Sequence, residues 1–274
     1  MPELPEVETI KRGLELVLPG KTIEGVDINY AGSIKAPSCE EFARQLPGLT
    51  FTGAGRRGKY LLLCLDDNSL LVVHLRMTGR LFFCESEIET DKHIHLKIIF
   101  KDGSRLYFHD VRKFGTIWWL PVSRACEIRG LAALGPEPLS ADFDVSYFNS
   151  KTDRRSTNIK ALLLDQTFVA GLGNIYVDEA LHKSGILPTR PAKSLTTPER
   201  KKLITSVQEV LLDAISWRGT TFNDYRDAAG MSGQFQNRLS VYQRHHKPCL
   251  SCGTFICRTV VAGRGTHFCP SCQS

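Results

Sequence analysis

The first six residues, Met1-Pro2-Glu3-Leu4-Pro5-Glu6, place a secondary amine beside a carboxyl group. If the initiator methionine is removed, Pro2 gains a free terminal amine, which is a nucleophile that can form an imine. The carboxyl group of Glu3 can act next to it as a general acid. On these six residues alone a plain helix start is the commoner interpretation, but the rest of the chain favours a catalytic amine.

Four cysteines near the C-terminus have the spacing of a metal site. Cys249 and Cys252 form one pair, Cys269 and Cys272 form the second, and sixteen residues separate the pairs. Two such turns present four thiolates, which is typical of a structural zinc ion. The total of nine cysteines is odd, and no secretory signal precedes them. This usage indicates a reducing compartment, so we expect one structural Zn²⁺ and a cytoplasmic protein.

Single residues in three loops could act on a nucleic acid. Lys59 precedes an apolar run and could be a base, a phosphate ligand or a solvated lysine at a strand end. Met77 is flanked by polar residues, where a methionine is either half-buried filler or a wedge between bases. Arg112 and Phe114 occupy a loop that ends in glycine, and this combination suits filling a gap in a base stack. Each of these residues is ambiguous by itself.

Two further segments could bind phosphate. The turn Gly171-Leu172-Gly173 opens a predicted helix at Asn174, and the N–H groups of such a helix start bind anions. Arg154, Arg155 and Lys160 precede this turn, which favours a DNA phosphate as the anion, although a solvated basic face is the alternative. Arg264 stands between two glycines at the expected tip of a zinc-held hairpin, where a guanidinium suits phosphate binding.

Overall charge and hydropathy favour a nucleic-acid partner over a membrane. The formal net charge is +6, and residues 221–274 contain six Lys and Arg but only two Asp. Such a basic C-terminal module suggests phosphate contact. No apolar run approaches the ~20 residues that a membrane span needs. No coiled-coil or interface pattern is visible in the sequence, so we expect a monomer.

Apolar periodicity predicts the elements that would position these groups. Residues 5–18 form an amphipathic pattern that would hold Pro2 and Glu3 at the positive end of a helix. Strand-like runs follow at 60–65, 69–75, 95–100, 105–109 and 116–120. Helices are predicted at 158–166, 174–184 and 198–217, the last with Thr197 as its N-cap.

The stiff stretch Gly135-Pro136-Glu137-Pro138-Leu139 separates the strand-rich part from the helical part. We therefore expect an α+β protein of two domains, with an antiparallel β domain at 1–135 and a linker at 136–150. A helical domain at 151–240, which ends in a polar loop at 223–240, would precede a zinc finger at 241–274.

Taken together, these segments resemble the bacterial formamidopyrimidine-DNA glycosylase family nearly end to end. The shared motifs are the first nine residues, Arg57-Gly58-Lys59-Tyr60, His74-Leu75-Arg76-Met77, Asp110-Val111-Arg112-Lys113-Phe114-Gly115, and residues 134–139, 170–179 and 261–270. The resemblance implies an N-terminal antiparallel β-sandwich with flanking helices, then a helix–two-turns–helix module and a β-hairpin zinc finger. Damaged double-stranded DNA would lie in the cleft, and the 223–240 loop would close over the flipped base.

The resemblance also implies the reaction and the role of each residue. Members of the family remove oxidised purines, chiefly 8-oxoguanine and formamidopyrimidines, and then cut the strand by β,δ-elimination. Pro2 would attack C1′ of the flipped nucleotide and Glu3 would help open the sugar ring. Lys59 and Arg264 correspond to the proton donors for β- and δ-elimination. The implied DNA contacts are His93, Arg112, Arg155 and Asn174, with Met77, Arg112 and Phe114 filling the gap in the duplex.

Two alternatives stay open at this point. Endonuclease VIII-like enzymes, which prefer oxidised pyrimidines, share Pro2 and Glu3. A non-catalytic zinc-finger protein that binds damaged DNA would not need Pro2, Glu3, Lys59 and Arg264 together. Thr78, Phe255 and Cys257 depart from the usual family pattern, and the divergent 223–240 loop leaves the substrate contacts unassigned.

Overall fold

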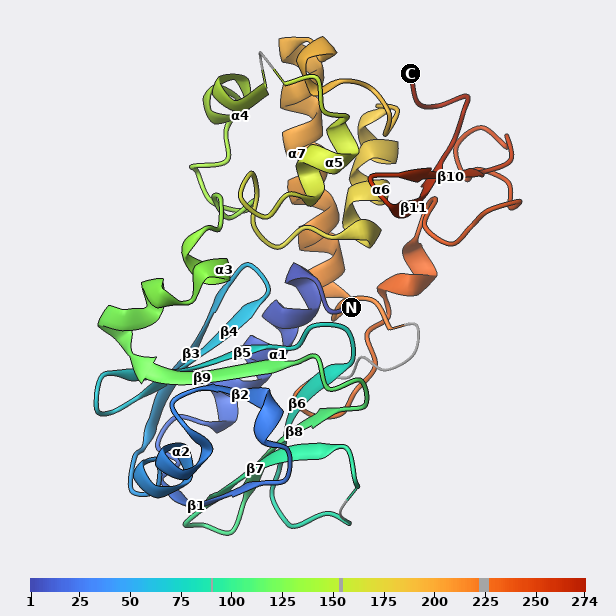
Figure 1. Cartoon of the computed structure of the whole chain (residues 1–274). Helices are drawn as coiled ribbons and strands as arrows, with labels where there is room; N and C mark the ends of the chain where they lie inside the picture. Colours follow the sequence, from blue (N-terminus) through green and yellow to red (C-terminus); the bar gives the residue numbers. More distant parts are fainter. Residues whose placement is uncertain (90, 153–154, 222–226) are drawn as a thin grey trace. The chain divides into compact units, whose positions relative to one another are not determined.

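Figure 1 shows the computed structural model, which describes residues 1–89, 91–152, 155–221 and 227–274. The chain forms two compact units. The first joins residues 1–132 to 217–234, and the second joins 133–216 to 235–274. Among the described helices, none is both long and apolar enough to cross a membrane.

The first unit is a β-sandwich flanked by helices, as predicted. One sheet has the strand order β1-β7-β8-β6 and the other has the order β2-β9-β5-β4-β3. The strands are β1 (Ile23–Ile28), β2 (Ile34–Ala36), β3 (Phe51–Arg57), β4 (Tyr60–Leu65), β5 (Ser69–His74), β6 (Gly79–Cys84), β7 (Ile94–Phe100), β8 (Arg105–Asp110) and β9 (Thr116–Pro121). Strands β2 and β9 run parallel, and the other pairs are antiparallel.

Helix α1 closes the core between these sheets. The helical elements of the unit are α1 (Leu4–Val17), α2 (Cys39–Gln45), α3 (Arg129–Ala132) and the 3₁₀ turns η1 (Ala31–Ser33) and η2 (Val122–Glu127). Val7, Ile10 and Leu14 of α1 are fully buried in one apolar cluster with residues of both sheets. Each such side chain contributes about 1.5–3 kcal/mol on burial, so the N-terminal helix is fixed to the sandwich.

Residues 217–234, which the sequence analysis placed with the helical domain, pack on the first unit. A Cβ added at Gly13 of α1 would lie 2.9 Å from Ala228 Cβ, and Phe83 donates its N–H to the carbonyl of Ala228 at 3.1 Å. A small residue at position 13 therefore seats this segment against α1. Residues 223–226 of the predicted loop lie outside the described residues.

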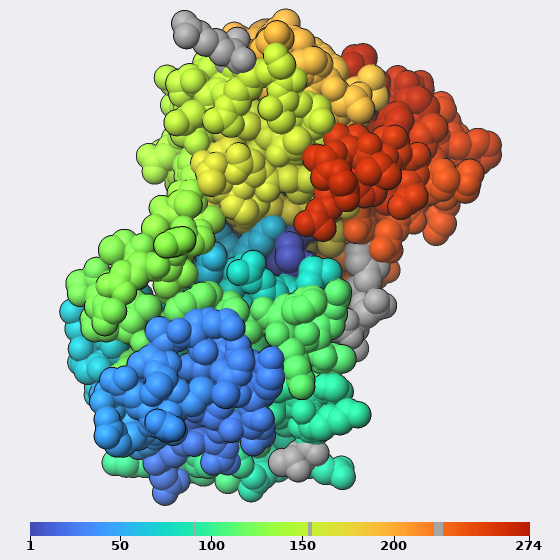
Figure 2. Space-filling view, viewed as in Figure 1, coloured from blue at the N-terminus to red at the C-terminus, as the bar shows by residue number. Residues whose placement is uncertain are grey.

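The second unit carries the helices and the finger. Its elements are α4 (Val145–Thr152), α5 (Ile159–Leu164), α6 (Asn174–Ser184), α7 (Thr197–Ser216), η3 (Ala192–Ser194), η4 (Phe235–Arg238), β10 (Cys257–Val261) and β11 (Arg264–Phe268). The α7 cap is Thr196 rather than the predicted Thr197, because Thr196 and Glu199 bond each other across the first turn. The C-terminal residues, red in Figure 2, form a compact knob on the surface of this unit.

Candidate functional site

The carboxylate of Glu6 holds the start of α1. Its Oε2 accepts the backbone N–H of Glu3 at 2.8 Å, and its Oε1 accepts the N–H of Thr220 at 2.7 Å. Glu3 in turn accepts the N–H of Glu6, which completes a capping box. Pro2 and Glu3 are buried while Met1 is exposed. The predicted amine and acid therefore lie together at a fixed helix start.

The position of the Glu6 carboxylate also explains why residue 219 is a glycine. Gly219 has φ +76°, and a Cβ there would lie 2.6 Å from Glu6 Oε1. A larger residue at position 219 would displace the Glu6 carboxylate from the N–H groups that donate hydrogen bonds to it. Glu6 had no predicted role, although its position three residues after the N-cap Glu3 is the signal of a capping box.

Lys59 lies in the two-residue turn between β3 and β4, after Gly58 at φ +56°. The residue is only 7% exposed. Arg56 ties this hairpin to α1, since its Nε donates to Glu8 Oε2 at 2.9 Å and its Nη1 donates to the carbonyl of Gly58 at 3.0 Å. Lys59 is therefore a buried lysine on a hairpin that is anchored to α1, the helix that follows the predicted amine of Pro2.

His74, at the end of β5, belongs to a motif noted in the sequence, but the sequence alone assigned it no role. Its Nδ1 accepts the backbone N–H of Arg76 at 3.0 Å, which supports Arg76 at φ +54° just before Met77. Burial, followed by the charges of Arg76 and Lys59, lowers the pKa of His74 to about 3. The ring is therefore neutral at pH 7, and because Nδ1 accepts, Nε2 carries the proton.

The low pKa of His74 makes stability fall in mild acid. In the unfolded chain His74 binds a proton near pH 6.5, and in the folded chain only near pH 3. The contribution of neutral His74 to the free energy of unfolding is therefore complete above pH 6.5 and is lost as the pH falls towards 3. Between pH 7.5 and 5 we expect the free energy of unfolding to fall by about 2 kcal/mol through this residue. Urea unfolding of the wild type and of His74→Gln at both pH values measures this loss. Equal losses in the two proteins would contradict the assignment.

Asp110 joins the loops that carry the predicted DNA-contacting residues. Its fully buried carboxylate accepts the hydroxyl of Thr78, the N–H of Arg112 at 3.2 Å and the N–H of Gly115 at 2.7 Å. Its own N–H donates to the carbonyl of His93 at 2.9 Å. Thr78, one of the departures from the family pattern, also accepts the N–H of Arg112 at 3.2 Å.

The side chains on these loops are exposed around that buried carboxylate. Met77 is 38% exposed and Phe114 is 50% exposed, so both apolar side chains are open to a partner. The Arg112 guanidinium lies 4.8 Å from the centre of the Phe114 ring, within cation–π range. The structure thus brings the loops of Met77, His93, Arg112 and Phe114 together.

Replacing Asp110 is expected to loosen both loops. Asp110→Ala leaves the N–H of Gly115 and the hydroxyl of Thr78 without their acceptor and leaves the N–H of Arg112 with Thr78 alone. We therefore expect the free energy of unfolding to fall by about 3 kcal/mol. Amide hydrogen exchange at 76–79 and 111–115 should accelerate together. Asp91→Ala is the control, because Asp91 is an exposed carboxylate that accepts the nearby N–H of His93. Exchange that changes in only one loop would show that Asp110 does not couple them.

In the second unit, Asn174 bonds the hairpin that carries Arg264. Its Nδ2 donates to the carbonyl of Gly265 at 2.8 Å. The flanking glycines predicted Arg264 at the hairpin tip. The tip is instead Ala262 and Gly263, both with positive φ, and Arg264 is the first residue of β11. Arg264 is exposed there. Asn174 and the strand of Arg264 are therefore held together.

Of the three basic residues noted before α6, Arg154 lies outside the described residues, and the other two have different environments. Arg155 is exposed, whereas Lys160 is fully buried, with its Nζ 2.6 Å from Asp178 Oδ1 and 3.3 Å from the carbonyl of Gly265. Asp178 Oδ2 accepts the N–H of His267 at 2.9 Å. A buried cation needs such a carboxylate. The interpretation of Lys160 as part of an exposed basic cluster is therefore wrong, and its place is in the support of the hairpin.

Glu179 anchors the segment that leads into the finger. Its carboxylate accepts the N–H groups of Ser240, Val241 and Tyr242 at 2.8–2.9 Å. Burial raises the pKa of Glu179, and these three donors oppose that rise. The side chains of Asn174, Asp178 and Glu179 thus all reach the finger from one helix. Asp178 and Glu179 lie in a motif noted in the sequence but had no predicted role. The four-residue spacing of the polar positions 174 and 178 was the available signal.

The four predicted cysteines form one cluster. The Sγ atoms of Cys249, Cys252, Cys269 and Cys272 lie within 4.8 Å of one another. The Sγ separation is 3.5 Å for Cys252–Cys269 and 3.9 Å for Cys249–Cys272, close to the ~3.8 Å of a tetrahedral ZnS₄ centre. Proximity of the other sulfurs raises the pKa of Cys272 to about 12, so four thiolates need a dication between them. The donor set fits zinc.

Known protein families and relatives match this chain along its length. Three family models match in order: Formamidopyrimidine-DNA glycosylase N-terminal domain at 1–117, Formamidopyrimidine-DNA glycosylase H2TH domain at 134–226, and Zinc finger found in FPG and IleRS at 247–274. A Formamidopyrimidine-DNA glycosylase of Desulforamulus reducens is 47% identical over 274 residues, covering 100% of this chain and 99% of the relative. The chain belongs to the formamidopyrimidine-DNA glycosylase family.

Solved structures of formamidopyrimidine-DNA glycosylases agree with this assignment. A complex of Lactococcus lactis Fpg with an abasic site containing DNA has a TM-score of 0.93 at 39% identity and 99% coverage of both chains. A complex of the wild-type Lactococcus lactis Fpg (MutM) with N7-Benzyl-Fapy-dG containing DNA has a TM-score of 0.93 at 39% identity and full coverage. The resemblance noted in the sequence is confirmed, as are the family's fold and its zinc finger, which holds one structural zinc ion.

Proposed function

We propose that this protein removes oxidised purines from duplex DNA through an imine on Pro2 and then cleaves the strand at the abasic site. It is a DNA glycosylase and lyase of its family. The observation that carries the residue assignment is the helix start of α1, where Glu6 fixes Glu3 beside Pro2. A binding protein without chemistry has no need for a buried acid next to a terminal amine.

The chemistry of Pro2 follows from its being a secondary amine once Met1 is removed. Its lone pair forms a bond to C1′ of the damaged nucleotide, the bond from C1′ to the base breaks, and the base leaves with a proton. At an ordinary terminal pKa of about 8, roughly a tenth of the amine is neutral near pH 7. The resulting iminium acidifies the hydrogens on C2′, which makes elimination of the 3′ phosphate possible.

Three further groups are assigned to the proton transfers. Glu3 protonates the sugar-ring oxygen as the ring opens. Lys59 serves β-elimination, and its place in a buried turn beside His74 supports a defined role. Arg264 serves δ-elimination from the start of β11, where its strand is bonded by Asn174. We propose these roles by correspondence of motifs, together with the local geometry of each unit.

DNA contact is assigned to six residues in two groups. Met77, Arg112 and Phe114 fill the gap that base flipping leaves, an unstacking cost of a few kcal/mol, and His93 contacts the DNA beside them. Arg155 and Asn174 bind backbone phosphate. Residues 221–274 contain six Lys and Arg against two Asp, which favours a polyanionic partner. We propose a monomer that acts in the cytoplasm on damaged double-stranded DNA.

The test is borohydride trapping on two duplexes, one carrying a single 8-oxoguanine opposite cytosine and the other a single oxidised pyrimidine. We expect a covalent adduct on the first, with the cross-linked peptide identified by mass spectrometry as the one that starts at Pro2. An adduct on the pyrimidine duplex alone would assign the substrate preference of the endonuclease VIII-like branch. No adduct on either duplex, with Met1 shown to be removed, would leave a DNA-binding protein without chemistry.

A further inference from the structure

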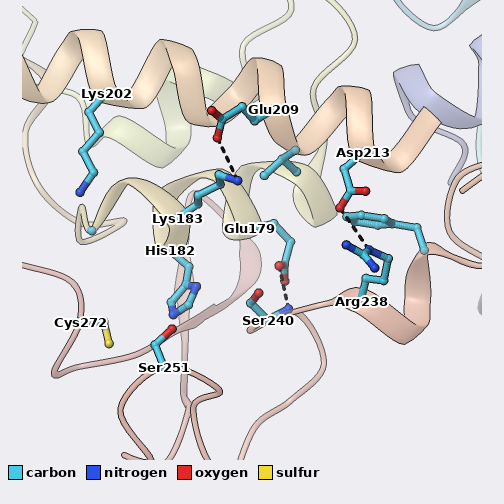
Figure 3. A pocket seen from close by; sticks show the side chains of 13 residues that line it. Glu179, His182, Lys183, Lys202, Glu209, Asp213, Arg238, Ser240, Ser251 and Cys272 are labelled. Carbon is cyan, nitrogen blue, oxygen red and sulfur yellow. Dashed lines mark hydrogen bonds and ion pairs between the residues drawn. The ribbon is translucent and has the colours of Figure 1, made fainter. Parts of the chain in front are cut away.

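A cavity of about 460 Å³ in the second unit is lined by residues of α6 and α7 and reaches the zinc ligand Cys272. Figure 3 shows that most charged groups on its wall are paired. Lys183 pairs with Glu209 at 2.9 Å, and Arg238 pairs with Asp213 at 3.2 Å. His182 stands apart from these pairs. Its ring lies on the side of the cavity that holds Ser251 and the zinc ligand Cys272.

His182 contacts the zinc cluster directly. It lies in the last turn of α6, is partly buried, and has its Nε2 3.5 Å from Cys249 Sγ. This separation is normal for a hydrogen bond to sulfur, whose larger radius lengthens it relative to bonds to oxygen. The contact therefore joins the helix to a metal ligand rather than to the peptide chain of the finger.

The direction of this hydrogen bond follows from the metal. A cysteine bound to zinc is a thiolate and has no proton to donate, so the imidazole must be the donor. Other sulfurs of the cluster have donors from inside the finger: Thr254 bonds the sulfur of Cys252, and the N–H groups of Ser271 and Cys272 bond that of Cys269. Cys249 differs, because its sulfur has a donor from α6.

We infer that His182 is a positioning residue of the zinc site, which donates its Nε2–H to the thiolate of Cys249 and so couples α6 to the metal. This goes beyond the proposed reaction and rests only on the presence of the zinc site. Groups that bond metal ligands from outside typically change metal affinity by roughly 10- to 100-fold. His182 extends the row formed by Asn174 and Asp178, each four positions apart, so three successive turns of one helix hold the finger.

Three variants of the full-length protein test this inference. His182→Phe keeps an aromatic ring without a donor, His182→Gln keeps an N–H donor, and Lys183→Met is the control on the same helical turn. Zinc release to a chromophoric chelator should be roughly tenfold faster in His182→Phe and near the wild-type rate in the other two. In the cobalt-substituted protein, the thiolate-to-cobalt charge-transfer band should move to longer wavelength in His182→Phe alone, because the thiolate has lost a donor.

Equal release rates and equal spectra in the wild type and His182→Phe would overturn the inference. So would equal changes in His182→Phe and His182→Gln, which would indicate packing rather than donation. A measurement on the unmodified zinc protein makes the test independent of how the variants fold. Long-range ¹H–¹⁵N spectra distinguish the two imidazole tautomers, and we expect the Nε2–H form for His182. The Nδ1–H form would rule out donation to Cys249.

Discussion

A chain that retains Met1 is expected to form no covalent adduct with damaged DNA, because the nitrogen of Pro2 is then part of a peptide bond and cannot attack C1′. Trapping and strand cleavage should fall by about 1,000-fold or more, as expected when a covalent nucleophile is lost. An amino-terminal extension that prevents methionine removal provides this chain, and its intact mass verifies it. Borohydride trapping on the 8-oxoguanine duplex gives the rate.

Pro2→Gly is the matched control, since a processed chain then begins with a primary amine in the same place. It should still be trapped, although more slowly, while the extended chain is not. Affinity for a duplex that carries an uncleavable abasic analogue should change little in either protein. Undiminished trapping in the extended chain would remove Pro2 from the mechanism. Equal losses of affinity and trapping in both variants would indicate that Pro2 only supports the fold of the helix start.

Loss of the metal is expected to unfold the finger. The buried core of this module is Val241, Cys249, Ile256 and Cys269, so half of its members are zinc ligands. Structural zinc contributes on the order of 10 kcal/mol, and a core this small supplies little by itself. Cys269→Ala should therefore lose zinc and the amide protection of β10 and β11. The affinity for damaged DNA should fall with it, together with the slope of affinity against salt.

The matched control for the finger is Cys257→Ala. Cys257 lies at the start of β10 outside the four-cysteine cluster, and its thiol donates only weakly, to the carbonyl of Phe255. This variant should keep one zinc per chain and a wild-type salt slope. Metal content by atomic absorption, amide exchange and binding at two salt concentrations separate the cases. A Cys269→Ala protein with protected hairpin amides and unchanged affinity would contradict a structural role for zinc.

The elements with strong periodicity were predictable from the sequence. The helices observed at Leu4–Val17 and Asn174–Ser184 and the strand at Tyr60–Leu65 match the predicted ranges within one residue. Strands β3 and β6 were not predicted, because glycine and arginine interrupt their apolar patterns. Their hydrogen bonds come from neighbouring strands, which local propensity does not reveal.

The chemistry-bearing groups could be named from the sequence, but the groups that hold them could not. Glu6, Asp110 and Asp178 are buried carboxylates, and each has at least one partner far away in the chain. Glu6 accepts an N–H from a residue 214 positions away, and Asp178 accepts one from 89 positions away. A buried carboxylate is indistinguishable in sequence from a solvated one until its donors are known. Lys160 illustrates the converse error, because a lysine in a basic stretch was buried.

The donors that Glu179 and Asp178 need have a consequence for biosynthesis. The chain grows at roughly 5–20 residues per second, so His267, 89 residues after Asp178, is added roughly 4 to 18 s later. Until residues 240–242 follow, Glu179 has no N–H groups to compensate its burial. During synthesis α6 must therefore stay exposed to solvent and undocked until these later residues have been added. Maturation of the second unit becomes a late event, in which metal capture and helix docking finish together.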